Sequence, residues 1–391
     1  MRGGWIAVAA AASITLPGIA VSLGLLPVDS DPIRAAVYGV AIVGAAFLLS
    51  WAAEVVQLDF SQGLALALLA LIAILPEYVV DATFAWLAAE DPAYAGYAVA
   101  NMTGANRLLI GTAWPMVIVI AWLRFRKSHI ELEPSHGLEV VVLLAATLYA
   151  FWLPFKDAIT LFDMAILVSM FGFYIWRVAR LPAEQPHLVG PAKLIGALEP
   201  MRRRIATAVL AIGAAGAILL VAKPFAQSLV NTGVTLGIDE FLLVQWLAPL
   251  ASEAPEFVVV ALFAWRGETT PALGTLVSSK VNQWTLLIAM LPLVYSVALG
   301  QPAGLPLDNR QREEIALTAA QSLFAVALLL NLSLSLVGAG LLFVLFVIQM
   351  VLPETRGIVT VVYFVLTAIV LALSRKRLGA AFAWLRPGSG N

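Results

Sequence analysis

The chain has 391 residues, of which 61% are hydrophobic and 12% charged, with a formal net charge of −1 and no cysteine. Soluble domains carry about 25% charged residues, so this composition and a mean hydropathy of +0.93 exclude an ordinary soluble fold. The balanced charge gives no sign of a nucleic-acid partner, and the missing cysteine excludes disulfides and thiolate metal sites. Apolar runs of about 20 residues without alternation predict membrane-spanning helices rather than barrel strands.

The first apolar run follows a single arginine and has no clear cleavage site, so we predict a retained helix rather than a signal peptide. A polar, proline-containing stretch at 181–203 divides the rest of the chain into two halves. Polar breaks then separate about twelve predicted spans, near residues 4–27, 33–57, 62–89, 93–123, 136–154, 158–178, 204–236, 239–265, 270–299, 314–332, 334–352 and 357–374.

Basic residues between the predicted spans gather on the side of the N-terminus, in the stretch 124–127, the central stretch and the C-terminal tail. The positive-inside rule makes this side cytoplasmic. We therefore expect an integral protein of a prokaryotic inner (plasma) membrane with both termini in the cytoplasm. The sequence indicates no oligomeric state.

Two segments repeat each other. Residues 76–86 read PEYVVDATFAW and residues 255–265 read PEFVVVALFAW, and eight of these eleven positions are identical. Their helices are five crossings apart, so the two copies are predicted to cross the membrane in opposite directions. Inverted repeats of this kind are typical of secondary transporters that hold their substrate near the middle of the membrane.

Each copy places a glutamate directly after a proline inside an apolar helix, Glu77 and Glu256. A carboxylate in lipid is costly and usually functional, and proline releases the carbonyl four residues earlier from the helix. Carboxylates with free carbonyls suit a hard cation, so we predict Glu77 and Glu256 as metal ligands. Glu253 and Asp81 lie one turn away on the same helices. Each acid has a structural alternative, a protonated and hydrogen-bonded carboxyl, and this alternative is strongest for Asp81, whose counterpart is Val260.

A weaker match joins residues 100–109, ANMTGANRLL, to residues 274–283, GTLVSSKVNQ. Its small residues allow close helix packing. The polar side chains in these segments are candidate ion ligands, or else hold helices together by hydrogen bonds. They include Asn101, Asn106, Ser279 and Gln283.

The pattern resembles the sodium/calcium exchanger superfamily of cation antiporters, whose repeats carry a G-T-S-x-P-E helix followed by a G-N-x-x-G-S-N helix. The residues that carry the resemblance are Pro76, Glu77, Asn101, Gly104 and Asn106 in the first copy, and Ser252, Pro255, Glu256, Gly274 and Ser279 in the second. The resemblance to a divergent bacterial-type member implies an all-α polytopic membrane protein of two inverted five-helix repeats. The implied segments are an additional helix in 1–30, repeats in 31–180 and 204–353, a cytoplasmic linker in 181–203, and an additional helix with a basic tail in 354–391.

The resemblance further implies that Glu77 and Glu256 face each other at the midplane and bind the transported cation in an alternating-access cycle. The chain departs from the family pattern at several ligand positions. Ala73 and Ile74 replace a threonine and a serine, and Lys280 replaces the asparagine expected opposite Asn106. Because several sodium ligands are missing, proton coupling is favoured.

We therefore expect a secondary antiporter that moves Ca²⁺ or Na⁺ in exchange for H⁺ or Na⁺, with inorganic cations as partners and no cofactor. Glu253, Asn106, Ser252 and Ser279 are expected to complete the ion shell, with Asp81, Asn101 and Gln283 as further candidates. Arg107 and Lys280 either neutralise the buried acids or, in the case of Lys280, occupy a cation site as a tethered ammonium.

Two other functions stay open. One is a degenerate exchanger that carries a different substrate or none. The other is an intramembrane enzyme, which the sequence disfavours because it has no D-D-x-x-D or H-E-x-x-H motif and because His129, His136 and His187 fall in predicted loops.

Overall fold

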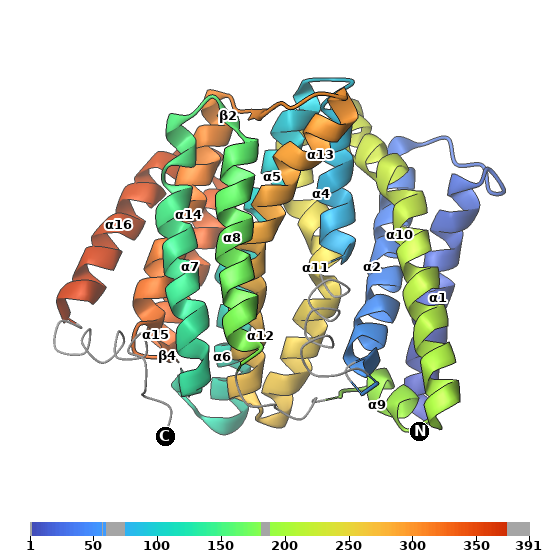
Figure 1. Cartoon of the computed structure of the whole chain (residues 1–391), viewed down its shortest axis with the longest axis horizontal. Helices are drawn as coiled ribbons and strands as arrows, with labels where there is room; N and C mark the ends of the chain where they lie inside the picture. The colour runs from blue at the N-terminus through green and yellow to red at the C-terminus, as the bar shows by residue number, and fades with distance from the viewer. Residues whose placement is uncertain (1, 57, 60–74, 181–187, 374–391) are drawn as a thin grey trace. The chain divides into compact units, whose positions relative to one another are not determined.

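The computed structural model describes residues 2–56, 58–59, 75–180 and 188–373 (Figure 1). The chain forms two compact units, unit 1 from Met1–Asn101 with Ile175–Glu256, and unit 2 from Met102–Tyr174 with Phe257–Asn391. The boundaries run through three helices, so each unit combines segments of both predicted repeats. The repeat boundaries are a division of the sequence that these packing units do not test, and they stay a prediction.

The described residues of unit 1 form helices and connecting loops, without a strand. It contains α1 (Arg2–Ser22), α2 (Asp31–Val56), α4 (Leu75–Leu87), the first part of α5 (Ala93–Leu108), the end of α8 (Leu161–Val178), α9 (Pro191–Gly196), α10 (Pro200–Leu236) and the first part of α11 (Glu240–Arg266). Helix α2 packs along both α1 and α10 (Figure 1). At Gly44 a Cβ atom would lie 2.5 Å from the Ala11 carbonyl oxygen. The missing side chain therefore lets the α1 and α2 backbones come together.

The second half of the predicted linker is bound to unit 1. Helix α9 packs against α1, α2 and α10, and the backbone N–H of Val189 donates to Glu54 at 3.0 Å. Just beyond α2, Asp59 accepts hydrogen bonds from Arg203 at 2.6 Å and from Arg204 at 3.0 Å. The hydrogen bond from Arg203 is the main cause that lowers the pKa of Asp59 to about 2. Residues 188–204 are thus a docked segment rather than a free loop.

Unit 2 contains the remaining helices and four short strands. Its elements are the end of α5, the π-helical turn η1 (Leu109–Ala113), α6 (Trp114–Phe125), β1 (His129–Glu131), η2 (Pro134–His136), α7 (Gly137–Ala150), η3 (Leu153–Phe155), β2 (Ala158–Ile159), most of α8, the end of α11, α12 (Thr269–Asn282), the π-helical turn η4 (Gln283–Leu287), α13 (Ile288–Leu299), β3 (Leu305–Pro306), α14 (Asn309–Leu329), β4 (Ser333–Ser335), α15 (Leu336–Val351), η5 (Pro353–Thr355) and α16 (Arg356–Leu373).

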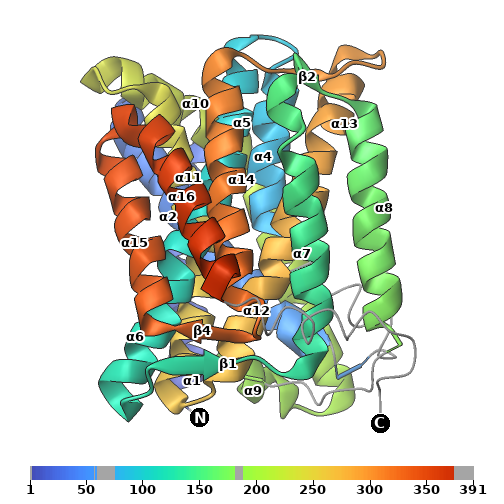
Figure 2. The ribbon, with the colours of Figure 1, turned by 90° about the vertical axis from the view of Figure 1, so that its left-hand side faces the viewer.

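The strands relate the two halves of the sequence within unit 2. β1 pairs antiparallel with β4, and β2 pairs antiparallel with β3. β1 and β2 flank α7, whereas β3 and β4 flank α14, so the start of α7 lies beside the end of α14 and the two helices run in opposite directions (Figure 2). β1, which precedes α7, corresponds to β3, which precedes α14, and β2 corresponds to β4 in the same way. The β1–β4 pair is therefore equivalent to the β2–β3 pair. This is the relation expected of inverted segments, although the layout of the complete repeats stays a prediction.

The two π-helical turns are a second correspondence between the halves. η1 begins three residues after Asn106, and η4 begins three residues after Lys280. Turns of this kind are frequently found at functional sites. Both copies of the weaker sequence match therefore lead into a locally widened helix, which the sequence analysis did not predict.

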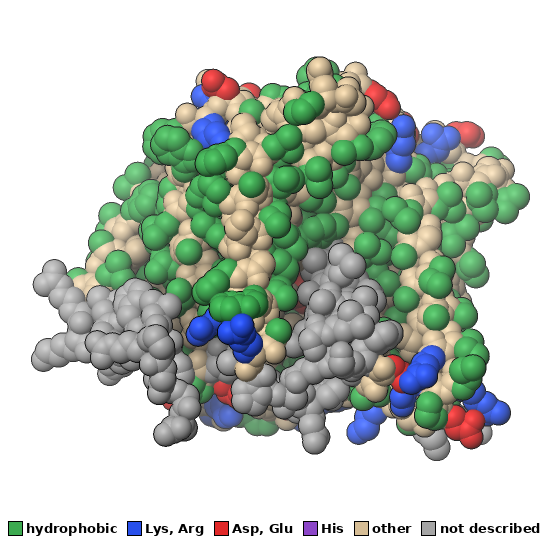
Figure 3. Space-filling view, viewed as in Figure 1, with side chains coloured by type: hydrophobic (Ala, Val, Ile, Leu, Met, Phe, Trp, Pro, Cys, Tyr) green, Lys and Arg blue, Asp and Glu red, His purple; other side chains and the backbone are tan. Residues whose placement is uncertain are grey.

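Among the described residues, nine helices are long and apolar enough to cross a membrane. Each of the twelve predicted segments contains a helix, but α4 has 13 described residues, α15 has 16, and α14 is not among the nine. The count of twelve crossings therefore stays a prediction. Hydrophobic side chains cover the lengths of α8 and α10, and charged side chains gather near their ends (Figure 3).

The packing of η1 against α15 predicts a strong size limit at Gly111. A Cβ atom at this position would lie 2.3 Å from Cγ of Phe346, so Gly111→Ala should lower the free energy of unfolding by about 1–3 kcal/mol through overpacking. Thermal unfolding of the detergent-solubilised protein measures this change. Gly172→Ala in α8 is the control, because no atom lies within 4 Å of its Cβ position. Equal melting temperatures for the two variants would contradict the prediction.

Candidate functional site

The first Pro-Glu segment opens the described part of α4. Pro76 and Glu77 lie in its first turn, and Glu77 is buried with 6% of its surface exposed. Asp81 lies one turn further along and is completely buried. The altered ligand positions Ala73 and Ile74 fall outside the described residues.

The second Pro-Glu segment lies inside α11, which runs through both Pro249 and Pro255. A proline has no N–H, so Pro255 releases the carbonyl four residues earlier from the helix ladder. The buried hydroxyl of Ser252 donates to the Ala248 carbonyl at 3.3 Å and to the Pro249 carbonyl at 3.2 Å, which leaves its oxygen lone pairs for other contacts. Glu253 is 4% exposed, and Glu256 is partly buried one turn later. One stretch of α11 thus collects a hydroxyl, two carboxyl groups and a released carbonyl.

Asn101 contacts Asp81 within unit 1. Its side-chain amide donates to Oδ1 of Asp81 at 2.7 Å, whereas Oδ2 of Asp81 is enclosed without a hydrogen-bond partner. Asn101 therefore acts as a hydrogen-bond donor to a carboxyl group in this structure. The contact agrees with the structural alternative for both residues, a carboxyl group and an amide that join two helices by a hydrogen bond.

Lys280 and Asn106, which occupy equivalent positions in the repeat, contact each other within unit 2. The Lys280 ammonium group is completely buried and donates to Oδ1 of Asn106 and, at 3.3 Å, to its backbone carbonyl. The ammonium also lies 4.5 Å from the ring centre of Trp284, a cation–π distance. Asn106 in turn donates to the Met102 carbonyl at 2.8 Å. The ammonium thus contacts the side-chain oxygen of Asn106, a residue that was expected to bind the transported ion.

Arg107 belongs to a second buried network in unit 2. It pairs with Glu314 of α14 at 2.5 Å and donates to Oε1 of Gln349 at 3.0 Å. Glu314 also pairs with Arg356 at the start of α16. From the sequence, Arg107 is predicted to neutralise the acids of the Pro-Glu helices. Glu314 is not among those acids, because the predicted span 314–332 begins at this residue. Because α14 begins at Asn309, Glu314 instead lies inside the helix and is completely buried.

The remaining candidates, Ser279 and Gln283, lie near Lys280 in sequence. Ser279 is partly buried on α12, and Gln283 opens η4 with 1% of its surface exposed. The candidate residues therefore divide between the units. Unit 1 holds Glu77, Asp81, Asn101, Ser252, Glu253 and Glu256, and unit 2 holds Asn106, Arg107, Ser279, Lys280 and Gln283.

Within the part of the chain that the structure describes, no group of three or more His, Asp or Glu side chains is arranged to hold a metal ion. A cation bound by Glu77 and Glu256 would therefore need further oxygen atoms from amides, hydroxyls or carbonyls. Within unit 1, the groups of that kind described above are Ser252 and the carbonyl released by Pro255.

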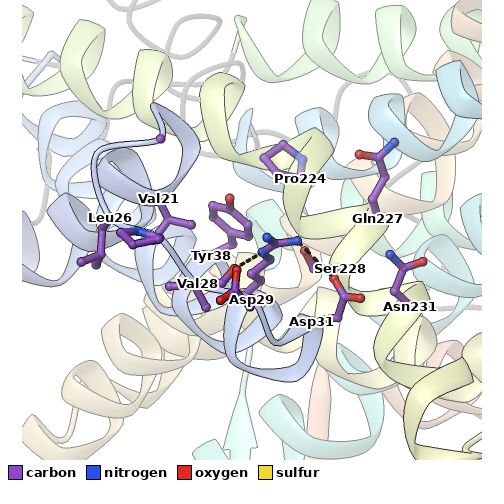
Figure 4. A pocket seen from close by; sticks show the side chains of 13 residues that line it. Val21, Leu26, Val28, Asp29, Asp31, Tyr38, Pro224, Gln227, Ser228 and Asn231 are labelled. Atoms are coloured by element: carbon purple, nitrogen blue, oxygen red, sulfur yellow. Dashed lines mark hydrogen bonds and ion pairs between the residues drawn. The ribbon is translucent and has the colours of Figure 1, made fainter.

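A separate polar pocket of about 410 Å³ lies in unit 1, where the α1–α2 loop and the start of α2 meet the C-terminal third of α10 (Figure 4). Arg34 lines it, donates to the Val28 carbonyl at 2.5 Å and lies 3.7 Å from Asp31. None of the candidate site residues lines this pocket.

Comparison with known proteins identifies the family. Residues 33–179 and 206–373 match the family described as "Sodium/calcium exchanger protein". The chain belongs to this family. The exchanger is similar to a solved structure of the H⁺/Ca²⁺ exchanger CAX, with 42% identity over 97% of each chain and a TM-score of 0.92. No curated protein sequence matches it.

Two more distant structures share the fold. Native YfkE is 17% identical over 89% of this chain and 98% of its own, with a TM-score of 0.65. The sodium-calcium exchanger NCX_Mj is 18% identical over 82% and 97%, with a TM-score of 0.54. The all-α polytopic fold and the family expected from the Pro-Glu repeats are confirmed. The chain is an integral membrane cation/Ca²⁺ antiporter, a transporter rather than an enzyme.

The network around Arg107 predicts a large effect of removing its acid. Glu314→Gln leaves two guanidinium groups without their shared counter-charge, and breaking a buried pair of this kind costs about 3–5 kcal/mol. We expect a clear fall in the melting temperature of the purified exchanger. Asp157→Asn is the control, because Asp157 pairs with Arg312 while its side chain is 98% exposed, and exposed pairs contribute about 0–1 kcal/mol. Similar decreases in melting temperature in both variants would contradict the prediction that the buried pair contributes more to stability than the exposed one.

Proposed function

We propose that this exchanger moves Ca²⁺ across the membrane in exchange for H⁺ by alternating access. The observation that carries the proposal is the 42% identity with an H⁺/Ca²⁺ exchanger over 97% of both chains. The sodium-calcium exchanger NCX_Mj, at 18% identity, informs only the fold. We further propose an inner-membrane location with cytoplasmic termini, from the basic residues in 124–127 and in the central linker.

Glu77 and Glu256 bind the transported ion in this proposal. Ca²⁺ takes six to eight oxygen ligands, mostly carboxylates, carbonyls and water, and α11 offers Ser252, Glu253 and the carbonyl released by Pro255 beside Glu256. The sequence motif adds Ser279 and Gln283 as further candidates. Asp81 and Asn101, which contact each other at 2.7 Å, support the helix that carries Glu77.

Competition for the same carboxylates provides the exchange. Two ionised carboxylates are costly in a low-dielectric environment. A divalent cation compensates both charges, and so do two protons. The site therefore holds either its cation or its protons, and loading one releases the other.

The Lys280–Asn106 contact favours protons over Na⁺ as the coupling ion. A buried ammonium at the oxygen atoms of Asn106 supplies a fixed positive charge where the family pattern has a second asparagine. The same contacts weaken the alternative of a degenerate exchanger for anions, because Lys280 already binds Asn106 and Arg107 already binds Glu314.

Flux measurements on variants of the two glutamates test the site. In proteoliposomes with an imposed pH gradient, Glu77→Gln and Glu256→Gln should each lower Ca²⁺ flux at least about 100-fold, because a carboxamide supplies neither the charge nor the proton. Glu90→Gln is the matched control, since this glutamate follows α4 and its side chain is 62% exposed. Transport that survives in both variants would refute the site assignment. Ca²⁺ flux driven by Na⁺ but not by H⁺ would refute proton coupling.

The role of Lys280 in coupling predicts a change in pH dependence. Lys280→Ala removes the fixed charge from the Asn106 oxygens, so the pH at half-maximal Ca²⁺ flux should move by at least about one unit, equivalent to about 1.4 kcal/mol. Lys223→Ala is the control, because this lysine is 52% exposed and lies 3.9 Å from Glu90. A folded Lys280→Ala variant with an unchanged pH profile would leave Lys280 a purely structural role.

A further inference from the structure

A buried acid outside the predicted ion site lies against the helix that carries Ser279 and Lys280. Glu139, near the start of α7, is 6% exposed. Its Oε1 accepts hydrogen bonds from the Tyr174 hydroxyl of α8 and the Ser278 hydroxyl of α12, each at 3.4 Å. Its Oε2 is enclosed and has no hydrogen-bond partner. A proton can therefore bind at Oε2 without breaking either existing contact.

His136 brings this acid into contact with a titratable, partly exposed group. Its Nδ1 lies 3.5 Å from Oε1 of Glu139, and its side chain is 19% exposed, compared with 8% for that of the glutamate. Imidazole is the side chain whose ordinary charge change falls between pH 5 and 8. The pair thus has one member with access to the surroundings and one member that is enclosed.

The His136 ring packs closely against α12 because Gly274 has no side chain. A Cβ atom there would lie 2.4 Å from Nε2 of His136. Gly274 and Ser278 are four residues apart and so lie on the same face of α12. His136 and Glu139 therefore contact successive turns of the helix that continues to Ser279 and Lys280. This gives a physical reason for Gly274, which the sequence analysis noted only as a small residue in a motif.

Two completely buried charged groups on the helices packed against α7 have their own partners. Glu314 on α14 binds Arg107 and Arg356, and Lys280 on α12 binds Asn106. Among the described residues, the titratable side chains in contact with Glu139 are His136 and Tyr174. Of these two side-chain types, imidazole is the one whose ordinary charge change lies near neutral pH.

We propose that His136 and Glu139 form a proton-handling pair that loads and unloads the protons exchanged by this protein. A proton taken up by the imidazole moves to the Glu139 carboxylate, which becomes neutral as the imidazole returns to its neutral form. The neutral carboxyl group then holds this proton beside Ser278 of α12. Transport in the opposite direction reverses these steps. The inference rests on proton exchange as the proposed function.

The test measures Ca²⁺ flux of the whole protein in proteoliposomes over a range of pH, with Ca²⁺ binding measured separately at equilibrium. Glu139→Gln preserves the size and the Oε1 acceptor but cannot take up the proton, and His136→Gln removes the imidazole. Both should lower proton-driven Ca²⁺ flux about tenfold or more and flatten its pH profile, while the dissociation constant for Ca²⁺ stays within about twofold. Tyr174→Phe, which removes a hydrogen bond to the same oxygen, should keep the pH profile.

The outcomes separate this inference from the proposed function. If the Ca²⁺ flux of the wild-type protein does not depend on the pH gradient, proton exchange itself is refuted. If the Ca²⁺ flux of the wild-type protein depends on the pH gradient and that of Glu139→Gln depends on it in the same way, only the proton-handling pair is refuted. If Glu139→Gln does not fold, Gly274→Ala tests the same path, because the added methyl group displaces the imidazole. An unchanged pH profile in that variant also overturns the pair.

Discussion

The cost of charge in a low-dielectric environment is the constraint on which this structure depends. The chain holds few charged residues for its length, yet several of them are completely buried. Each buried charge therefore needs a counter-charge, a set of oriented dipoles or a proton. Arg107 has Glu314, Lys280 has the Asn106 oxygens and the Trp284 ring, and Asp81 has the amide of Asn101. In the proposed function, the two Pro-Glu glutamates are compensated by what the protein transports.

The same constraint separates structural charges from functional ones. The Arg107–Glu314–Arg356 network is compensated within the protein and joins α5, α14 and α16. These buried ion pairs therefore attach α16 to the rest of unit 2. The Glu139 carboxyl is different, because it contacts an imidazole and two hydroxyl groups rather than a lysine or arginine, and one of its oxygen atoms has no hydrogen-bond partner. Groups of this second kind are those that can change protonation state during a transport cycle without disrupting the fold.

The fold class and the family could be predicted from the sequence because they depend on composition and on a strongly repeated motif, and the same motif makes Glu77 and Glu256 the predicted ion ligands. Lipid requires long apolar helices, and the repeat at Pro76–Glu77 and Pro255–Glu256 stands out against them. The counter-charge of Arg107 was missed because Glu314 was placed at a helix end, where an acid is ordinary. Side-chain contacts such as Lys280–Asn106 require coordinates, although the equivalence of the two positions in the repeat pointed to them. The strands were missed because two or three residues leave no alternation to detect.

The paired strands at the two ends of α7 and α14 have a mechanical consequence. β1–β4 and β2–β3 fasten these antiparallel helices to each other at both ends. Sliding one helix past the other by a single residue, about 1.5 Å, would break hydrogen bonds at both fastenings at once. The two helices must therefore move together as one rigid body. Any conformational change during transport has to occur in segments that are not joined to a neighbour at both ends.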